Sequence, residues 1–164
     1  MKEFFEQLYI KRILKYALYL YLSLVVQNML LSRFRPAGVC PFILPAVCAA
    51  VGMFRGSTWG TVFSLVLGIF ADMAFVENTV LFTIVFPAIA FFSGAVSQFY
   101  INKRFFAFMS LAFVSLLFTA LVQLAVTTAR DTFSVSMIPT AILQAVWSLP
   151  ISAAAYFPPA RWIE

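Results

Sequence analysis

The chain contains no histidine, and charged residues are scarce, with 11 Lys or Arg and 6 Asp or Glu among 164 residues. Without histidine the sequence lacks the most common general base and the most common metal ligand of proteins. A membrane hydrolase with a Ser/His pair is therefore excluded. The low charge content argues equally against a soluble domain, because a chain of this length would leave much of its surface facing water.

Other catalytic arrangements are missing as well. Asp72 is the only carboxylate predicted at membrane depth, so an intramembrane aspartyl dyad lacks its second member. Cys40 and Cys48 fall in one predicted span, where buried single thiols usually serve as small apolar fillers. The sequence shows no glycine-rich phosphate loop and no calcium loop. We therefore expect a protein that is not an enzyme and that uses no metal and no cofactor.

What the sequence does contain is apolar: 63% of the residues are hydrophobic, and 20 are Phe. One charge at the centre of a bilayer costs about 2.5–3.5 kcal/mol, and a helix needs about 20 residues to cross the hydrocarbon core. Six charge-free runs approach that length. The predicted spans are Ile13 to Leu31, Ala37 to Phe54, Thr58 to Val76, Thr79 to Ile101, Phe105 to Ala129 and Met137 to Phe157.

These runs are apolar on all sides and lack the alternation of a membrane β-barrel, so helices are expected to satisfy the backbone in lipid. The sequence thus predicts an all-α integral membrane protein, residues 1–164 forming a single transmembrane domain of six helices in a compact bundle. Prolines within the second, fourth and last spans predict kinks where they remove a helical hydrogen bond. These are Pro41, Pro45, Pro87, Pro139 and Pro150.

Basic residues indicate the orientation, because they accumulate in short cytoplasmic loops. With the N-terminus inside, eight Lys or Arg residues lie on the cytoplasmic side and three on the outer side, which predicts that both termini are cytoplasmic. The net charge of +5 is then a feature of topology, and no nucleic-acid partner is expected. The N-terminal stretch lacks a small-residue cleavage site, and we interpret it as a retained first span in contact with membrane lipid.

Small residues recur at every fourth position from the second span into the third. Residues at this spacing drift slowly around an α-helix and let helix backbones approach closely. The stripe is either a packing seam inside the bundle or a docking face for another protein. Its members are Gly52, Gly56, Gly60, Ser64 and Gly68, and it ends at Asp72.

Asp72 is the most informative residue, because ionisable groups within a membrane are costly and usually face a cavity or a partner. The predicted topology places it about one turn below the outer surface, near other polar residues, and we expect an ion pair with an arginine of the first outer loop. The cluster is either a network that fixes helix register or a site for a ligand or partner. Its members are Asp72, Arg33, Arg35, Gln27, Asn28, Gln123 and Gln144.

Several short motifs resemble the MreD rod-shape-determining family of bacterial inner-membrane proteins. Gln27-Asn28 ends the first span and Arg35-Pro36 opens the second. Leu44-Pro45 and the basic turn Phe54-Arg55-Gly56 follow. The remaining motifs are Gly60, the stretch Leu67-Gly68-Ile69-Phe70-Ala71-Asp72, and Ile138-Pro139, Gln144 and Leu149-Pro150 in the last helix.

The resemblance implies a six-helix fold similar to the substrate-binding subunits of energy-coupling-factor vitamin transporters. It also implies a non-enzymatic role in the cell-elongation machinery of the bacterial cytoplasmic membrane, helping to organise peptidoglycan synthesis. The implied partners are an MreC-like bitopic protein, an MreB-like actin homologue, a RodA-like glycosyltransferase and a class B penicillin-binding transpeptidase.

The alternative is a transport subunit of the energy-coupling-factor type, for which the outer polar cluster would form the substrate pocket. Such subunits dock through a small-residue pair at spacing four on the first helix. Here the first helix carries Tyr16, Tyr19 and Tyr21 instead, although Ala46 and Ala50 supply such a pair on the second.

Overall fold

The computed structural model describes residues 2–31, 33, 40–74, 80–99, 105–130 and 137–161, and every regular element in these ranges is helical. In chain order the elements are α1 (Lys2–Val25), the π-helical η1 (Val26–Leu31), α2 (Leu44–Arg55), α3 (Ser57–Ala74), α4 (Leu81–Phe99), α5 (Phe105–Arg130), α6 (Met137–Ser152), the 3-10 helix η3 (Ala153–Tyr156) and α7 (Phe157–Arg161). The all-α prediction is confirmed for this part of the chain.

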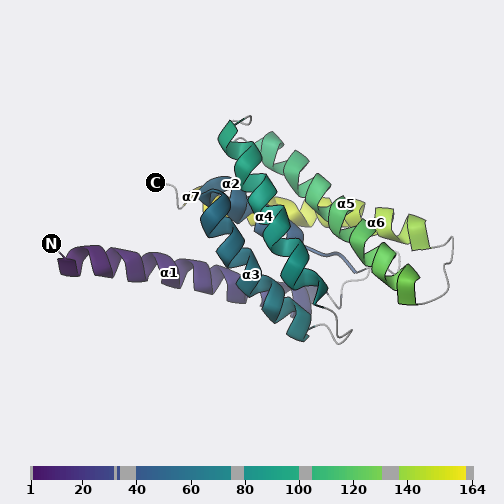
Figure 1. Ribbon diagram of the computed structural model, residues 1–164, viewed down its shortest axis with the longest axis horizontal. Helices are drawn as coiled ribbons and strands as arrows, with labels where there is room; N and C mark the ends of the chain where they lie inside the picture. Colours follow the sequence, from purple (N-terminus) through teal and green to yellow (C-terminus); the bar gives the residue numbers. More distant parts are fainter. Residues whose placement is uncertain are drawn as a thin grey trace.

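Helix α2 forms the centre of the bundle. All residues from Pro41 to Phe54 are buried, and α2 contacts α1, α3, α4, α5, η3 and α7. Figure 1 shows α3 and α4 crossing side by side over α2, with α5 and α6 forming a second pair. Alanine, glycine and cysteine make up much of α2, which is why six other helical elements can approach it closely.

The predicted second span, Ala37 to Phe54, is wrong as a continuous helix. Residues Cys40 to Ile43 are not helical, and α2 has only 12 residues. Its length is roughly 18 Å at 1.5 Å per residue, well short of a hydrocarbon core about 30 Å thick. The predicted kinks at Pro41 and Pro45 are also absent, because Pro41 lies before the helix and Pro45 lies in its first turn, where proline is tolerated.

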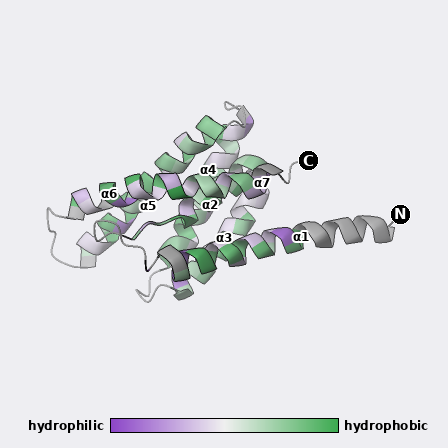
Figure 2. Ribbon diagram, turned by 180° about the vertical axis from the view of Figure 1, so that it is seen from behind, coloured by the Kyte–Doolittle hydropathy of each residue, from purple (hydrophilic) through white to green (hydrophobic). Residues whose placement is uncertain are grey.

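Among the described residues, four helical segments are long and apolar enough to cross a membrane: Ser57–Ala74, Leu81–Gln98, Phe105–Ala129 and Ile138–Pro159. They match the predicted spans within a few residues. Figure 2 shows hydrophobic residues along these helices, and many of the large ones are exposed. Pro87 lies inside α4 and Pro150 inside α6, and the 3-10 helix η3 begins three residues after Pro150.

Helix α1 is less embedded than the others. It begins at Lys2, 11 residues before the predicted first span, and its N-terminal half extends beyond the bundle (Figure 1). Tyr19 and Ser23 of α1 and Gln27 of η1, spaced four residues apart, are buried on one face, whereas Leu18, Tyr21 and Leu22 are exposed. The start of α1 and the short helix α7 lie toward the same end of the molecule.

Candidate functional site

Gln27 holds the non-helical segment that precedes α2. Its side chain is 3% exposed, its Nε2 donates a hydrogen bond to the carbonyl oxygen of Pro41 (3.0 Å), and its Oε1 accepts one from the backbone N–H of Ile43 (2.9 Å). Buried backbone groups outside a helix need such partners, because each unpaired one is costly in an apolar surrounding. The π-helical η1 carries Gln27, so α1 ends where it can clamp the start of α2.

A second polar contact continues from this segment toward α6. The backbone N–H of Phe42 donates to Ser148 Oγ (2.8 Å), and Ser148 Oγ donates to the carbonyl oxygen of Gln144. Beside this contact Gln123, Gln144, Thr119 and Ser148 line a cavity of about 10 Å³. That volume holds about one water molecule.

Asp72 lies at the end of α3 and caps the start of α4. Its carboxylate accepts hydrogen bonds from the backbone N–H groups of Phe82 (3.0 Å) and Thr83 (2.8 Å) and from the Thr83 hydroxyl (2.6 Å). The first N–H groups of a helix have no partner inside it and carry a partial positive charge, which a carboxylate satisfies. Asp72 therefore connects α3 to α4 through a helix terminus.

The other predicted members of the polar cluster are separated. Gln27, Gln123 and Gln144 lie around the segment that contains Phe42, whereas Asp72 lies beyond Phe82, whose ring is 5.3 Å from that of Phe42 between centroids. Asn28 is exposed. Arg33 is exposed and, within the described chain, forms no ion pair with Asp72, and Arg35 lies outside the described residues.

The small residues of the predicted stripe lie against neighbouring helices of the same chain. A Cβ added to Gly52 would lie 2.3 Å from the carbonyl oxygen of Ala90, one added to Gly60 would lie 2.6 Å from the Cα of Gly52, and one added to Gly68 would lie 2.6 Å from the carbonyl oxygen of Phe82. Ser64 is fully buried as well. The geometry is that of a packing seam between α2, α3 and α4.

Gly56 has a different reason to be glycine. It joins α2 to α3 with φ of +88°, in the left-handed region that other residues rarely adopt. The two helices can therefore turn sharply against each other, which brings Gly52 and Gly60 into contact.

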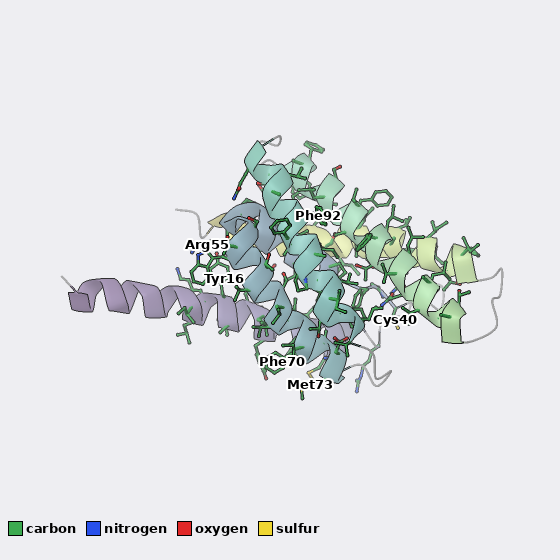
Figure 3. The ribbon with its side chains drawn as sticks, in the orientation of Figure 1. Tyr16, Cys40, Arg55, Phe70, Met73 and Phe92 are labelled. Carbon is green, nitrogen blue, oxygen red and sulfur yellow. The ribbon has the colours of Figure 1, made fainter. Side chains whose placement is uncertain are left out.

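An apolar groove lies between α1 and α3, a feature that was not predicted from the sequence. It has a volume of about 330 Å³, and Arg55 lies along it with its Nε–H donating to the Tyr16 hydroxyl and its guanidinium carbon 5.1 Å from the centre of the Tyr16 ring (Figure 3). The lining residues are Ile13, Tyr16, Ala17, Leu20, Val51, Arg55, Trp59, Val62, Phe63 and Val66. The tyrosines of the first helix were the available signal, since they replace small residues that would have let α1 pack closely.

Metal chemistry finds no supporting geometry in the part of the chain that the structure describes. There, no three His, Cys, Asp or Glu side chains gather in one place, and Cys40 and Cys48 are both free thiols. Cys40 precedes α2, and Cys48 is buried within it.

Comparison with known proteins decides the family. The model of the rod shape-determining protein MreD family matches residues 9–155, nearly the whole chain. The chain belongs to the MreD family. The family has a role in determining rod shape and consists of membrane proteins, so the matched motifs, from Gln27-Asn28 to Leu149-Pro150, lie in a shape-determining membrane protein.

MreD proteins are structural components of shape determination and not a known enzyme family. The searches of curated proteins and of solved structures each find no match. The expected similarity to energy-coupling-factor subunits therefore stays a prediction from the sequence.

Proposed function

We propose that this MreD-family chain is a non-enzymatic membrane component that helps organise peptidoglycan synthesis by docking partner membrane proteins on its outer helix faces. The partners implied by the family are an MreC-like bitopic protein, an MreB-like actin homologue, a RodA-like glycosyltransferase and a class B penicillin-binding transpeptidase. Recognition then takes place between helices, where close packing and interhelical hydrogen bonds supply the binding energy.

One observation carries this proposal: three polar side chains inside the bundle bind the protein's own backbone. Gln27 clamps the segment before α2, Ser148 holds Phe42, and Asp72 caps α4. The cavity beside Gln123 and Gln144 has a volume of about 10 Å³, whereas pockets for small molecules usually measure about 300–1,000 Å³. The predicted polar cluster thus supports a register-fixing role.

The alternative, a vitamin-transport subunit, would need a substrate pocket at this cluster. A cavity of one water molecule gives that alternative no support. The scaffold function is therefore the better account of the same residues.

We further propose that the chain crosses the bacterial cytoplasmic membrane six times, with both termini in the cytoplasm and the second crossing made by α2 together with the buried non-helical segment before it. In Figure 1 the start of α1 and helix α7 lie toward the same end of the molecule, which supports an even number of crossings. The distribution of basic residues supports the orientation. Reporter fusions should place both termini and the turn at Arg55 in the cytoplasm. Termini on opposite membrane faces would contradict the count.

Docking is tested by photo-crosslinking in native membranes. A photoreactive residue is placed at one exposed position on each of four helices: Phe70 on α3, Phe92 on α4, Phe118 on α5 and Val146 on α6. Figure 3 shows Phe70 and Phe92 on the outer faces of their helices. A reactive residue at the buried Phe86 is the matched control.

At least one exposed position should form a crosslink to an MreC-like or transpeptidase partner, and Phe86 should form none. Absence of partner crosslinks from all four faces, with the protein at its normal membrane level, would contradict the docking proposal. Crosslinks to lipid alone would also contradict the docking proposal.

A further inference from the structure

The groove between α1 and α3 has aromatic and aliphatic walls. Phe63 of α3 contacts both Tyr16 and Tyr19, with 6.2 Å between ring centroids in each pair, and these contacts hold α1 away from the floor of the groove. Val51 of α2 also lines the groove, and Val62 and Val66 line it from α3. The lining of this space of about 330 Å³ is mostly apolar and offers few groups that could bind water, so within a membrane the space suits a hydrocarbon chain.

Arg55 gives this groove a charge. Its Nε–H is used by the Tyr16 hydroxyl, and no described carboxylate pairs with the guanidinium. Asp72 is the only carboxylate whose side chain is described, and it lies at the far end of α3, 15 residues and roughly 22 Å beyond Ser57 at 1.5 Å per residue. A guanidinium at the border of a membrane is stabilised by a phosphate, which it can bind with two parallel hydrogen bonds.

We propose that this groove binds an acidic phospholipid, with one acyl chain along the apolar wall and the phosphate on Arg55. Arg55 lies at the end of the groove near the turn from α2 to α3 and so provides one charged end beside an apolar channel. Basic pockets between membrane helices bind acidic headgroups in this manner. Lipid binding in this groove is an activity additional to the proposed docking of protein partners.

A lipid chain fits the space better than a partner helix does. A helix with its side chains is about 10–12 Å across, so even three turns displace much more volume than the groove offers. The walls also present one cation and no described acidic group, which favours an anionic ligand over a neutral helix face.

Trp59 lines the groove and supplies the reporter. In a background with Trp147→Phe and Trp162→Phe, the protein is reconstituted in phosphatidylcholine vesicles that contain equal fractions of brominated phosphatidylglycerol or brominated phosphatidylcholine. Bromine on the acyl chain quenches a neighbouring indole. The apparent affinity for phosphatidylglycerol should exceed that for phosphatidylcholine about fivefold, as expected for one basic residue near an acidic lipid.

Arg55→Gln should remove this preference, and Arg55→Lys should keep most of it. Arg33→Gln is the matched control, because it deletes the same charge from an exposed position on another segment and should leave the preference unchanged. Equal quenching by both lipids in the unaltered background, or an equal loss in the Arg33 and Arg55 variants, would overturn the proposal.

A second variant tests the groove without changing charge. Ala17→Phe fills the apolar wall and should reduce quenching by both brominated lipids at least twofold, whereas Leu18→Phe, on the adjacent exposed position outside the groove, should not. Unchanged quenching in the Ala17 variant would overturn the proposal. The proposal would also be overturned if the Ala17 variant lost its partner crosslinks while the quenching by lipid stayed intact. That result would assign the groove to a partner helix.

Discussion

The seam between α2, α3 and α4 and the attachment of α1 show two ways of joining helices in lipid. In the seam, Gly52 faces the backbone of Ala90, and two serines of α4, Ser93 and Ser97, donate hydrogen bonds to the carbonyl oxygens of Ala49 and Met53 on α2. Small side chains bring the backbones together, and hydroxyl groups connect them. The result is a contact without space for another molecule.

Helix α1 is joined by larger side chains at separate points. Tyr19 donates a hydrogen bond to the carbonyl oxygen of Ala155 (2.9 Å), Tyr16 contacts Phe63 and Arg55, and Gln27 reaches the segment before α2. Between these points lies the groove. Small residues thus produce the closed core, and aromatic residues produce an open surface at which lipid can enter.

The largest expected effect comes from the seam. Gly52→Val places side-chain carbons against the Ala90 carbonyl group, and the overpacking should cost about 3 kcal/mol or more in the free energy of unfolding. Thermal unfolding in detergent and the yield of folded protein are the measurements. Ala125→Leu adds the same number of carbons to an exposed position of α5 and should change neither. Equal stability of the Gly52 and Ala125 variants would show that α2 can move away from α4 at the seam without loss of stability.

Gln27→Leu should have the next largest effect. It removes both hydrogen bonds to the segment before α2 and leaves two buried backbone groups without these partners, at a cost of about 2–3 kcal/mol. Gln98→Leu changes an exposed amide of α4 and serves as the control, with little expected change in unfolding temperature. A Gln27 variant as stable as the control would mean that water or a rearranged backbone supplies hydrogen bonds to the Pro41 carbonyl oxygen and the Ile43 N–H.

Asp72→Ala should cost about 1–2 kcal/mol, the range for loss of a helix cap. The effect is smaller than at Gln27 because Asp72 is only half-buried and water can replace the carboxylate. Arg35→Gln distinguishes the cap from the ion pair predicted by the sequence. If Arg35→Gln leaves the free energy of unfolding unchanged, the cap explains the stability of the α3–α4 connection. If Arg35→Gln and Asp72→Ala lower it equally, and the double variant lowers it no further, the ion pair is favoured.

The smallest expected effect belongs to α1. Tyr19→Phe removes one hydrogen bond to Ala155, and such bonds in membrane proteins average about 0.6 kcal/mol. Hydrogen exchange of the α1 backbone amides should increase, with the exchange of α2 unchanged. A loss as large as that of Gly52→Val would remove the contrast between the two regions.

Much of the fold was predictable from the spacing of charges. The predicted ranges from residue 58 onward agree with the helices within a few residues, because each charge is costly inside the bilayer. The prediction of the second span was wrong because hydropathy does not show that the helix begins only at Leu44, after Pro41 and with Pro45 in its first turn. The side chains that satisfy the freed backbone, Gln27 and Ser148, lie far away in the sequence.

The polar residues of the candidate site could be picked out from the sequence, but their grouping could not, because Gln27 and Asp72 bind different segments. Gln27, Gln123, Gln144 and Asp72 are polar residues inside an apolar chain, which hydropathy detects. The hydrogen-bond partners of the Gln27 and Asp72 side chains are mostly backbone groups of other segments of the chain, and those depend on tertiary packing. The groove escaped prediction because a space between helices has no signature in a single sequence.

The central claim is that the protein acts through its outer faces and not through a buried ligand site. The most direct test replaces both amides of the inner cavity by the nearly isosteric Gln123→Met and Gln144→Met in cells whose rod shape depends on this chain. The account predicts normal membrane level, unchanged partner crosslinks and rods of normal width. Rounded cells with a folded double variant at its normal level would contradict it and assign function to the inner cavity.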